Sequence, residues 1–288
     1  MVGKILQDFI SIAIELTALF VGISFLVSLL QGFIPYEKLN KYLSGRNTFI
    51  GVTAAIAFAF ITPFCSCSTI PVVVNLLNKK VRFGTVMVFL FASPVLDPTI
   101  ITLMATLLGV KVAIVYTLVT SILSIIIGLL LEKLGFESAV KKVTMTGFNE
   151  KEIKFSFKGA LKETMSLMKT VYPYLLIGAG IGSIIHEAVP TEWIMTYLGD
   201  DKWWLVPVAA IIGIPLYIRI STMIPLSQIL IAKGMAFPPV MALMIGSTGA
   251  SLPEIALLNS IFQKRLVSAF IVSVVLMASI SGFLFYLI

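Results

Sequence analysis

Long apolar segments restrict this chain more than any other feature. They cover about residues 9–34, 48–78, 83–108 and 110–132 in the first half, and 165–189, 203–232, 238–262 and 266–288 in the second. A helix that crosses a bilayer needs roughly 20 apolar residues, and every segment reaches that length. Only 12% of the residues are charged, against about a quarter in soluble domains. The sequence therefore predicts an all-α polytopic membrane protein with about eight transmembrane segments.

The two halves resemble each other after a shift of 154 residues. Pro71 then lies on Pro225, Lys79 on Lys233, and Ser93 on Ser247. Weak internal symmetry of this kind is typical of transporter folds. It predicts a first membrane repeat at 1–132, a linker at 133–164 and a second repeat at 165–288. Because four crossings per half return the chain to its starting side, we expect parallel repeats.

Basic residues predict the orientation. The linker region is rich in lysine, and the positive-inside rule places it in the cytoplasm, so both termini are expected there too. Lys79, Lys80 and Arg82 agree with this orientation, whereas Lys38, Lys41 and Arg46 oppose it. The net charge of +7 fits a multi-pass protein of the plasma (inner) membrane whose basic residues lie in loops. The chain has no known module for binding nucleic acid. No nucleic-acid partner is expected.

The segment 48–78 contains a sequence that a lipid-spanning helix does not need, Thr62-Pro63-Phe64-Cys65-Ser66-Cys67-Ser68-Thr69-Ile70-Pro71. The prolines and small polar residues interrupt the helical hydrogen bonds where lipid offers no substitute partners. Non-helical backbone at that depth is tolerated where it is buried in protein or lines a cavity. We expect a discontinuous helix at the centre of the protein, either crossing the membrane or re-entrant.

Cys65 and Cys67 are the only cysteines, and thiolates are soft ligands for Cu(I), Zn(II) and, by the same argument, trivalent arsenic or antimony. If 68–78 forms a half-helix, both thiols lie at its N-terminal end, where the thiolate is favoured. The alternative is that they are small buried apolar residues. We predict a metal- and substrate-binding site at Cys65 and Cys67.

The matching segment of the second half supplies further candidates. The same shift places Cys65 on Arg219 and Cys67 on Ser221. An arginine among apolar residues should face the interior or a partner, so Arg219 either holds an anionic group or forms a structural ion pair. The predicted substrate-binding set also contains the neighbouring residues Ser66, Ser68, Ser221 and Met223.

Two further breaks each place a carboxylate beside a proline. Asp97 lies in Ser93-Pro94-Val95-Leu96-Asp97-Pro98, and Glu254 ends Gly246-Ser247-Thr248-Gly249-Ala250-Ser251-Leu252-Pro253-Glu254. Intramembrane carboxylates mark ion or proton pathways, although Asp97 would also serve as a helix cap. We predict proton coupling by Asp97 and Glu254, with Glu254 favoured because Glu is the poorer cap.

The chain resembles the predicted-permease family that includes the ArsP organoarsenical efflux permeases and the YraQ-like permeases. The resemblance rests on the Pro-Phe-Cys-Ser-Cys-Ser signature, the duplicated layout, and the breaks at Ser93-Pro94 and Gly246-Ser247-Thr248. The resemblance covers nearly the whole chain. It implies a secondary transporter, and it suggests export of a trivalent organoarsenical or a soft metal ion.

Three alternatives remain open. The substrate could be a sulfur-containing anion held mainly by Arg219, or the chain could be a membrane thiol–disulfide oxidoreductase that uses Cys65 and Cys67. A structural or partner-subunit role is the third alternative. The sequence contains no phosphate-binding loop and no Ser/His/Asp set, so we expect no enzyme activity and no cofactor. The expected partners are a small-molecule or ion substrate and the lipid bilayer, with a homo-oligomer or a partner subunit left open.

Overall fold

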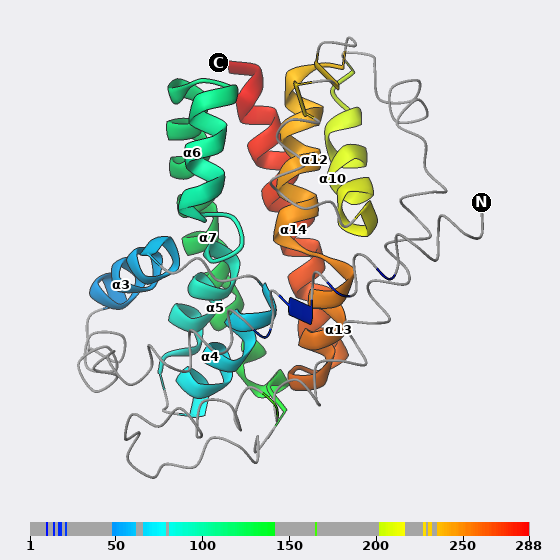
Figure 1. The fold of residues 1–288 in the computed structure, drawn as a ribbon. Coiled ribbons are helices and arrows are strands. Elements are labelled where there is room, and N and C mark those ends of the chain that lie inside the picture. Colours follow the sequence, from blue (N-terminus) through cyan, green and yellow to red (C-terminus); the bar gives the residue numbers. More distant parts are fainter. Residues whose placement is uncertain are drawn as a thin grey trace.

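The computed structural model describes residues 48–61, 66–78, 81–141, 202–216, 227–228, 230–231 and 235–287, together with residues 10, 14, 17–18, 21 and 165. The helices are α3 (Thr48–Ile61), α4 (Ser66–Asn78), α5 (Phe83–Ala92), α6 (Pro98–Leu107), α7 (Val110–Lys133), α10 (Leu205–Leu216), α12 (Phe237–Gly249), α13 (Leu252–Ile261) and α14 (Lys264–Leu284), with short 3-10 helices η1 (Phe136–Ala139) and η2 (Phe285–Leu287). Figure 1 shows them as one bundle in which α7 and α14 are the long members.

The prediction of an all-helical protein is confirmed for the described residues. Their one β contact is an isolated antiparallel bridge between Val140 and Phe262. The predicted apolar segments 9–34 and 165–189 lie almost entirely outside the described residues.

Three of the predicted apolar segments each form two short helices. Segment 48–78 contains α3 and α4, segment 83–108 contains α5 and α6, and segment 238–262 contains α12 and α13. Proline explains two of the new starts, because Pro98 and Pro253 occupy the first turns of α6 and α13, where a missing N–H costs nothing. The predicted breaks at Ser93–Pro98 and Gly246–Glu254 are confirmed.

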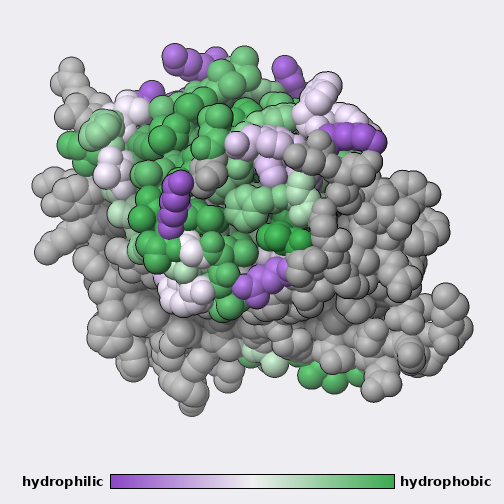
Figure 2. All heavy atoms as spheres, turned by 90° about the horizontal axis from the view of Figure 1, so that it is seen from above, coloured by the Kyte–Doolittle hydropathy of each residue, from purple (hydrophilic) through white to green (hydrophobic). Residues whose placement is uncertain are grey.

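Two described helices, α7 and α14, are long and apolar enough to cross a bilayer. One face of α7 carries large aliphatic side chains that are each more than half exposed, and the opposite face is buried. The exposed residues are Ile114, Leu118, Ile122, Ile126 and Leu130. Seen from the end where the C-terminus lies, the described surface is also largely apolar (Figure 2). Exposed apolar surface on this scale marks contact with lipid or protein rather than with water.

Glycine brings α5 and α7 into close contact. A Cβ on Gly128 would lie 2.6 Å from Val88 Cγ2 and 2.7 Å from the Val88 backbone nitrogen. Gly84, near the start of α5, lies beside Glu132, near the end of α7. The two helices therefore run antiparallel.

The helices α7 and α14 also run antiparallel. Beyond the end of α7, the Lys141 backbone N–H donates to Ile261 O at 3.0 Å, just before α14 begins. At mid-helix, the Ser124 hydroxyl donates to Met277 Sδ at 3.8 Å. Parallel repeats would require α7 and α14, which occupy matching positions, to run in the same direction. The predicted parallel relation is therefore wrong for this pair of helices.

Two apolar cores lie at opposite ends of the bundle, and each draws on both halves of the chain. The first, the basic-end core, contains buried residues of α3, α4 and α5 together with α13 and the start of α14. The second, the tryptophan-end core, contains residues of α10 and α12 together with α6, the start of α7 and the end of α14. The half-helices α6 and α13, which follow the α5–α6 and α12–α13 breaks, thus each pack into the core formed mainly by the other half.

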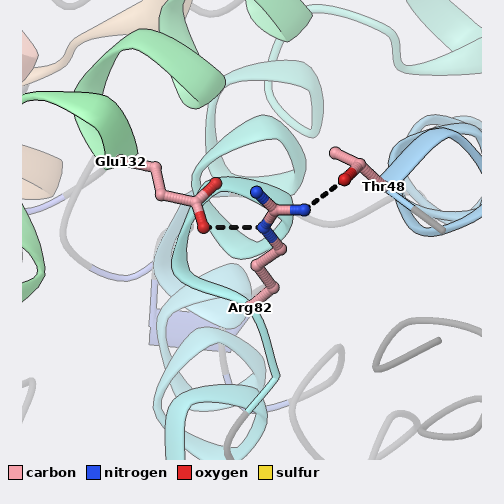
Figure 3. Close-up of polar contacts among 3 residues, drawn as sticks. All are labelled: Thr48, Arg82 and Glu132. Atoms are coloured by element: carbon pink, nitrogen blue, oxygen red, sulfur yellow. Dashed lines mark hydrogen bonds and ion pairs between the residues drawn. The ribbon is translucent and has the colours of Figure 1, made fainter. Parts of the chain in front are cut away.

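A polar contact closes the basic end of the bundle. The Arg82 guanidinium, just before α5, donates from Nε to Glu132 Oε1 at 2.7 Å and also hydrogen-bonds Thr48 at the start of α3 (Figure 3). The described basic residues at this end are Arg82, Lys133, Lys141, Lys264 and Arg265, which give the end its name. The first turn of α10 at the opposite end follows the exposed Trp203 and Trp204.

Candidate functional site

Buried polar side chains gather where the two cores meet. On α7, Thr120 and Ser124 lie between Tyr116 of the tryptophan-end core and Leu131 of the basic-end core. The broken helices carry similar residues at their interruptions. We call this set the polar layer; it consists of Thr69, Ser93, Thr120, Ser124, Ser247, Thr248 and Glu254. A buried polar layer between two apolar cores is where a membrane protein can accommodate a polar solute.

Side chains from other helices hold the break between α5 and α6. The hydroxyls of Thr69 on α4 and Ser93 at the end of α5 lie 3.1 Å apart, and both side chains are fully buried. The Tyr116 hydroxyl on α7 donates to Val95 O at 3.0 Å. The Tyr116 bond satisfies a backbone carbonyl that the interrupted helix leaves without its usual partner. The Thr69–Ser93 contact attaches the end of α5 to α4.

A local motif holds the break between α12 and α13. The Glu254 backbone N–H donates to Ser251 Oγ at 3.4 Å, and the Ser251 N–H donates to Glu254 Oε2 at 3.5 Å. This reciprocal pair is a capping box at the start of α13. The Glu254 side chain is fully buried. Glu254 therefore takes part in capping as the third residue of α13, with Ser251 at the N-cap, and its proton coupling stays a prediction.

Helix α4 begins at Ser66, so the backbones of Ser66, Cys67 and Ser68 form its first turn. This start lies two residues before the predicted half-helix 68–78. Helix α4 contacts α5 and α13. The helix that bears Cys67 therefore lies against both broken helices, which is the neighbourhood that a shared site requires.

Several predicted site residues lie outside the described part of the chain. They are Cys65, Arg219, Ser221 and Met223, together with the side chains of Ser66, Cys67 and Ser68. The predicted Cys65–Cys67 metal site is therefore not tested. Among the residues that the structure does describe, no group of three or more His, Cys, Asp or Glu side chains could hold a metal ion.

Asp97 occupies the residue before α6 and is half-buried. Its carbonyl oxygen accepts the Ile101 N–H at 3.1 Å, which is the first hydrogen bond of that helix. Asp97 therefore holds the N-cap position that the capping alternative requires. Proton coupling by Asp97 stays a prediction.

Three of the residues that hold the breaks, Ser251, Thr69 and Tyr116, were not given a role in the sequence prediction. Ser251 had a readable signal, because Ser-x-x-Glu before an apolar run is the capping-box pattern. Thr69 and Tyr116 had none, since a hydroxyl residue in an apolar helix does not indicate its partner on another helix.

Several known proteins are similar to this chain along most of its length. It is 22% identical to the UPF0718 protein MJ0584 of Methanocaldococcus jannaschii, an alignment that covers 98% of this chain and 97% of the relative. It is 23% identical to the UPF0718 protein YraQ of Escherichia coli, over 83% of this chain and 68% of the relative. A Streptococcus mutans protein named as a subunit of a two-component membrane permease complex is 21% identical, over 88% of this chain and 82% of the relative.

No solved structure matches the chain. The family described as "Predicted permease" (ArsP_1) matches residues 1–287. Membership supports a membrane protein and a transporter rather than an enzyme, in agreement with the lipid-compatible surface of α7 and α14. From the polar layer, the broken helices and this match, we conclude that the chain belongs to the ArsP_1 family of predicted permeases.

Proposed function

We propose that this permease is a secondary transporter of a thiophilic solute, a trivalent organoarsenical or a soft metal ion, and that it binds the solute in the polar layer. The observation that carries the proposal is the position of α4. Cys67 belongs to its first turn, and the Thr69–Ser93 contact ties that turn to the α5–α6 break. Helix α4 also contacts α13, whose first turn carries the buried Glu254.

The chemistry of the proposed site follows from its residue types. Cys65 and Cys67 supply soft thiolate ligands, and the start of a helix favours the thiolate over the thiol. Arg219 of the second half balances the charge of the bound species. Ser66, Ser68, Ser221 and Met223 line the remainder of the site. The solute is exported across the plasma membrane, and no cofactor takes part.

We also propose that the two membrane repeats, 1–132 and 165–288, are inverted copies joined by the linker 133–164. The starts of α5 and α12, of α6 and α13, and of α7 and α14 are each 154 residues apart, the same shift that aligns the sequences. The turn in which Val81 N–H donates to Leu76 O recurs 154 residues later between Met235 and Leu230. The antiparallel pairing of α7 and α14 favours inversion over the parallel arrangement. Inverted repeats with sites at their broken helices are typical of secondary transporters.

Proton coupling is assigned to Glu254, with Asp97 as a second carboxylate. Glu254→Gln separates coupling from capping, because Gln also fits a capping box but does not titrate. We expect Glu254→Gln to reach wild-type amounts in the membrane and to lose pH-driven transport. Ser251→Ala keeps the carboxylate and removes its capping partner, so it should retain pH-driven transport. The measurement is solute flux in proteoliposomes with and without an imposed pH gradient.

The substrate class is tested with the two thiols. We expect Cys65→Ser and Cys67→Ser to abolish efflux of a trivalent organoarsenical, arsenite or Cu(I) from everted vesicles, at unchanged protein levels. Ser268→Ala, at an exposed position of α14 outside the proposed site, leaves both thiols intact and is the control. Full efflux of all three solutes by both serine variants would remove the thiols from the mechanism.

A sulfur-containing anion is the second candidate. The observation in its favour is that α4, α6 and α13 each begin directly after an interruption of a predicted apolar segment, and helix N-termini favour anions. On this alternative Arg219 is the main binding group. Uptake of labelled thiosulfate or sulfite that Arg219→Gln abolishes, and that Cys67→Ser only weakens, would favour the anion over the soft metal.

A partner subunit is also proposed. The relative from Streptococcus mutans is named as one subunit of a two-component complex. Purification of this chain with an affinity tag in mild detergent, followed by mass spectrometry of the complex, should reveal either a second subunit or a homo-oligomer. A purified monomer that transports the solute would contradict both.

A further inference from the structure

We infer that the linker and the C-terminus lie on opposite sides of the membrane, with the basic end in the cytoplasm, and that α3 and α4 form a re-entrant hairpin that enters from the cytoplasm. The inference depends on the membrane location of the family and is independent of the proposed substrate. It replaces the expectation that both termini are cytoplasmic.

The length of α14 supports the inference that the linker and the C-terminus lie on opposite sides of the membrane. Its 21 residues extend about 32 Å at 1.5 Å per residue, enough for a hydrocarbon core of roughly 30 Å. At its start, the Gln263 N–H donates to Ala139 O at 2.9 Å, so α14 begins beside the start of the linker. At its other end, Phe285 stacks edge-on against Phe237, the first residue of α12, with ring centroids 5.6 Å apart. The chain therefore leaves the linker side and finishes on the far side (Figure 1).

The distribution of charge sets the orientation. Five described basic residues lie at the end of the bundle where α7 finishes and α14 starts: Arg82, Lys133, Lys141, Lys264 and Arg265. Of the basic residues that the structure describes, the far end has Lys111 and Lys202, beside the exposed Trp203 and Trp204. Cytoplasmic loops carry the excess of Lys and Arg, and tryptophan gathers at membrane–water interfaces. The basic end is therefore the cytoplasmic one.

The re-entrant hairpin is inferred from the positions of the start of α3 and the end of α4. Thr48, the first residue of α3, is hydrogen-bonded to Arg82 at the basic end (Figure 3). Asn78, the last residue of α4, lines a small cavity there with Lys141 and Phe262. The helices have 14 and 13 residues, about 20 Å each, too short to cross. Both helices therefore have their outer ends on the same side, and the Thr69–Ser93 contact marks how far α4 reaches inward.

Helix α10 belongs to the opposite side. A Cβ on Gly282, near the end of α14, would lie 2.6 Å from Val206 Cγ1, so the start of α10 lies at the tryptophan end. The Gln228 amide donates to Leu107 O at 2.7 Å, where α6 finishes. In this arrangement α4, whose first turn includes Cys67, has its outer end on the cytoplasmic side, and α10 begins on the opposite side.

The first experiment leaves both native cysteines in place. Green fluorescent protein and alkaline phosphatase are fused in turn to the C-terminus of the full chain and expressed in bacterial cells. We expect an active phosphatase fusion and no fluorescence, because phosphatase folds outside and the fluorescent protein folds inside. A fluorescent fusion with inactive phosphatase would overturn the inference.

The second experiment uses single cysteines in a chain with Cys65→Ser and Cys67→Ser. Thr48→Cys and Asn78→Cys report on the two outer ends of the hairpin at the basic end, and Lys202→Cys reports on the tryptophan end. With a membrane-impermeant maleimide on intact cells, we expect Lys202→Cys to be labelled and the other two to be labelled only after permeabilisation. Labelling of both Thr48→Cys and Asn78→Cys in intact cells would overturn the orientation. Labelling of only one of these two would overturn the re-entrant hairpin. A chain that transports nothing still gives a readable result in both experiments.

Discussion

The two broken helices, α5–α6 and α12–α13, are held at their breaks by different kinds of hydrogen bonds. The break between α5 and α6 spans residues 93–97 and is closed by Thr69 from α4 and Tyr116 from α7. The break between α12 and α13 spans only Ala250 and Ser251 and is closed by a capping box within α13. The first break thus depends on distant helices, and the second depends on its own sequence.

The difference indicates which break is suited to move. Movement of α4 or α7 alters the hydrogen bonds that hold the first break, so a displacement of the thiol-bearing helix is transmitted directly to residues 93–97. The second break keeps its capping box whatever its neighbours do, and it holds Glu254 in a buried, fixed position. The first break is therefore held by contacts from two other helices, whereas the second is held within α13 and carries the buried Glu254.

The largest effect is expected at Gly246, three residues before the end of α12. A Cβ there would lie 2.4 Å from Ala210 O, and backbone cannot easily retreat. Gly246→Val should lower the free energy of unfolding by about 3 kcal/mol or more. Thermal unfolding in detergent and the folded yield measure the loss. The control is Ala92→Gly, at the matching end of α5, where we expect a smaller loss. Equal losses would mean that the two broken helices are packed equally tightly.

Tyr116→Phe addresses the non-local support of the first break. It leaves Val95 O without the hydroxyl donor, and a buried acceptor without a partner costs about 2 kcal/mol. Hydrogen exchange should increase in peptides that cover residues 93–97 and stay unchanged in those that cover 250–254. Increased exchange at both breaks would contradict the separation of the two supports.

Ser251→Ala addresses the local support of the second break. Loss of the side-chain cap should cost about 1 kcal/mol, with faster exchange confined to the first turn of α13. Ser251→Thr keeps the hydroxyl and should restore most of the stability. If exchange also increased across residues 93–97, the second break would not be self-contained.

The smallest effect concerns the Thr69–Ser93 pair. A double-mutant cycle with Thr69→Val and Ser93→Ala should give a coupling free energy of about 0.6 kcal/mol, the average for hydrogen bonds between membrane helices. A cycle that pairs Thr69 with Thr102 should give none, because the Thr102 hydroxyl donates to Pro98 O within α6. A coupling of zero in the first cycle would remove α4 from the support of this break.

Much of the fold is predictable from the residues. Proline and glycine clusters locate the breaks within Ser93–Pro98 and Gly246–Glu254, because prolines disrupt helical hydrogen bonds wherever the chain lies. The Ser-x-x-Glu pattern at Ser251 is also a local signal for the capping box, although we did not predict the box from it. The partners of Thr69 and Tyr116 were not predictable, since they come from other helices.

The direction of the helices was also misjudged for a physical reason. Segment 48–78 has the length of a crossing, and length alone predicts four crossings per half and parallel repeats. The structure divides that segment into α3 and α4, each too short to cross, and pairs α7 with α14 antiparallel. If each half contains one re-entrant segment, as we propose for α3 and α4 in the first, the number of crossings per half is odd and the second half is inverted.

By itself, the sequence determined the all-helical class, the membrane environment, the positions of the breaks and the family, because these depend on local hydrophobicity, on proline and on similarity along the chain. Only the tertiary structure decided which helices share a core, which side chains close each break and which way α14 runs. These features depend on contacts between residues far apart in the sequence, such as Lys141 with Ile261 and Thr69 with Ser93, and no local pattern encodes such a pairing.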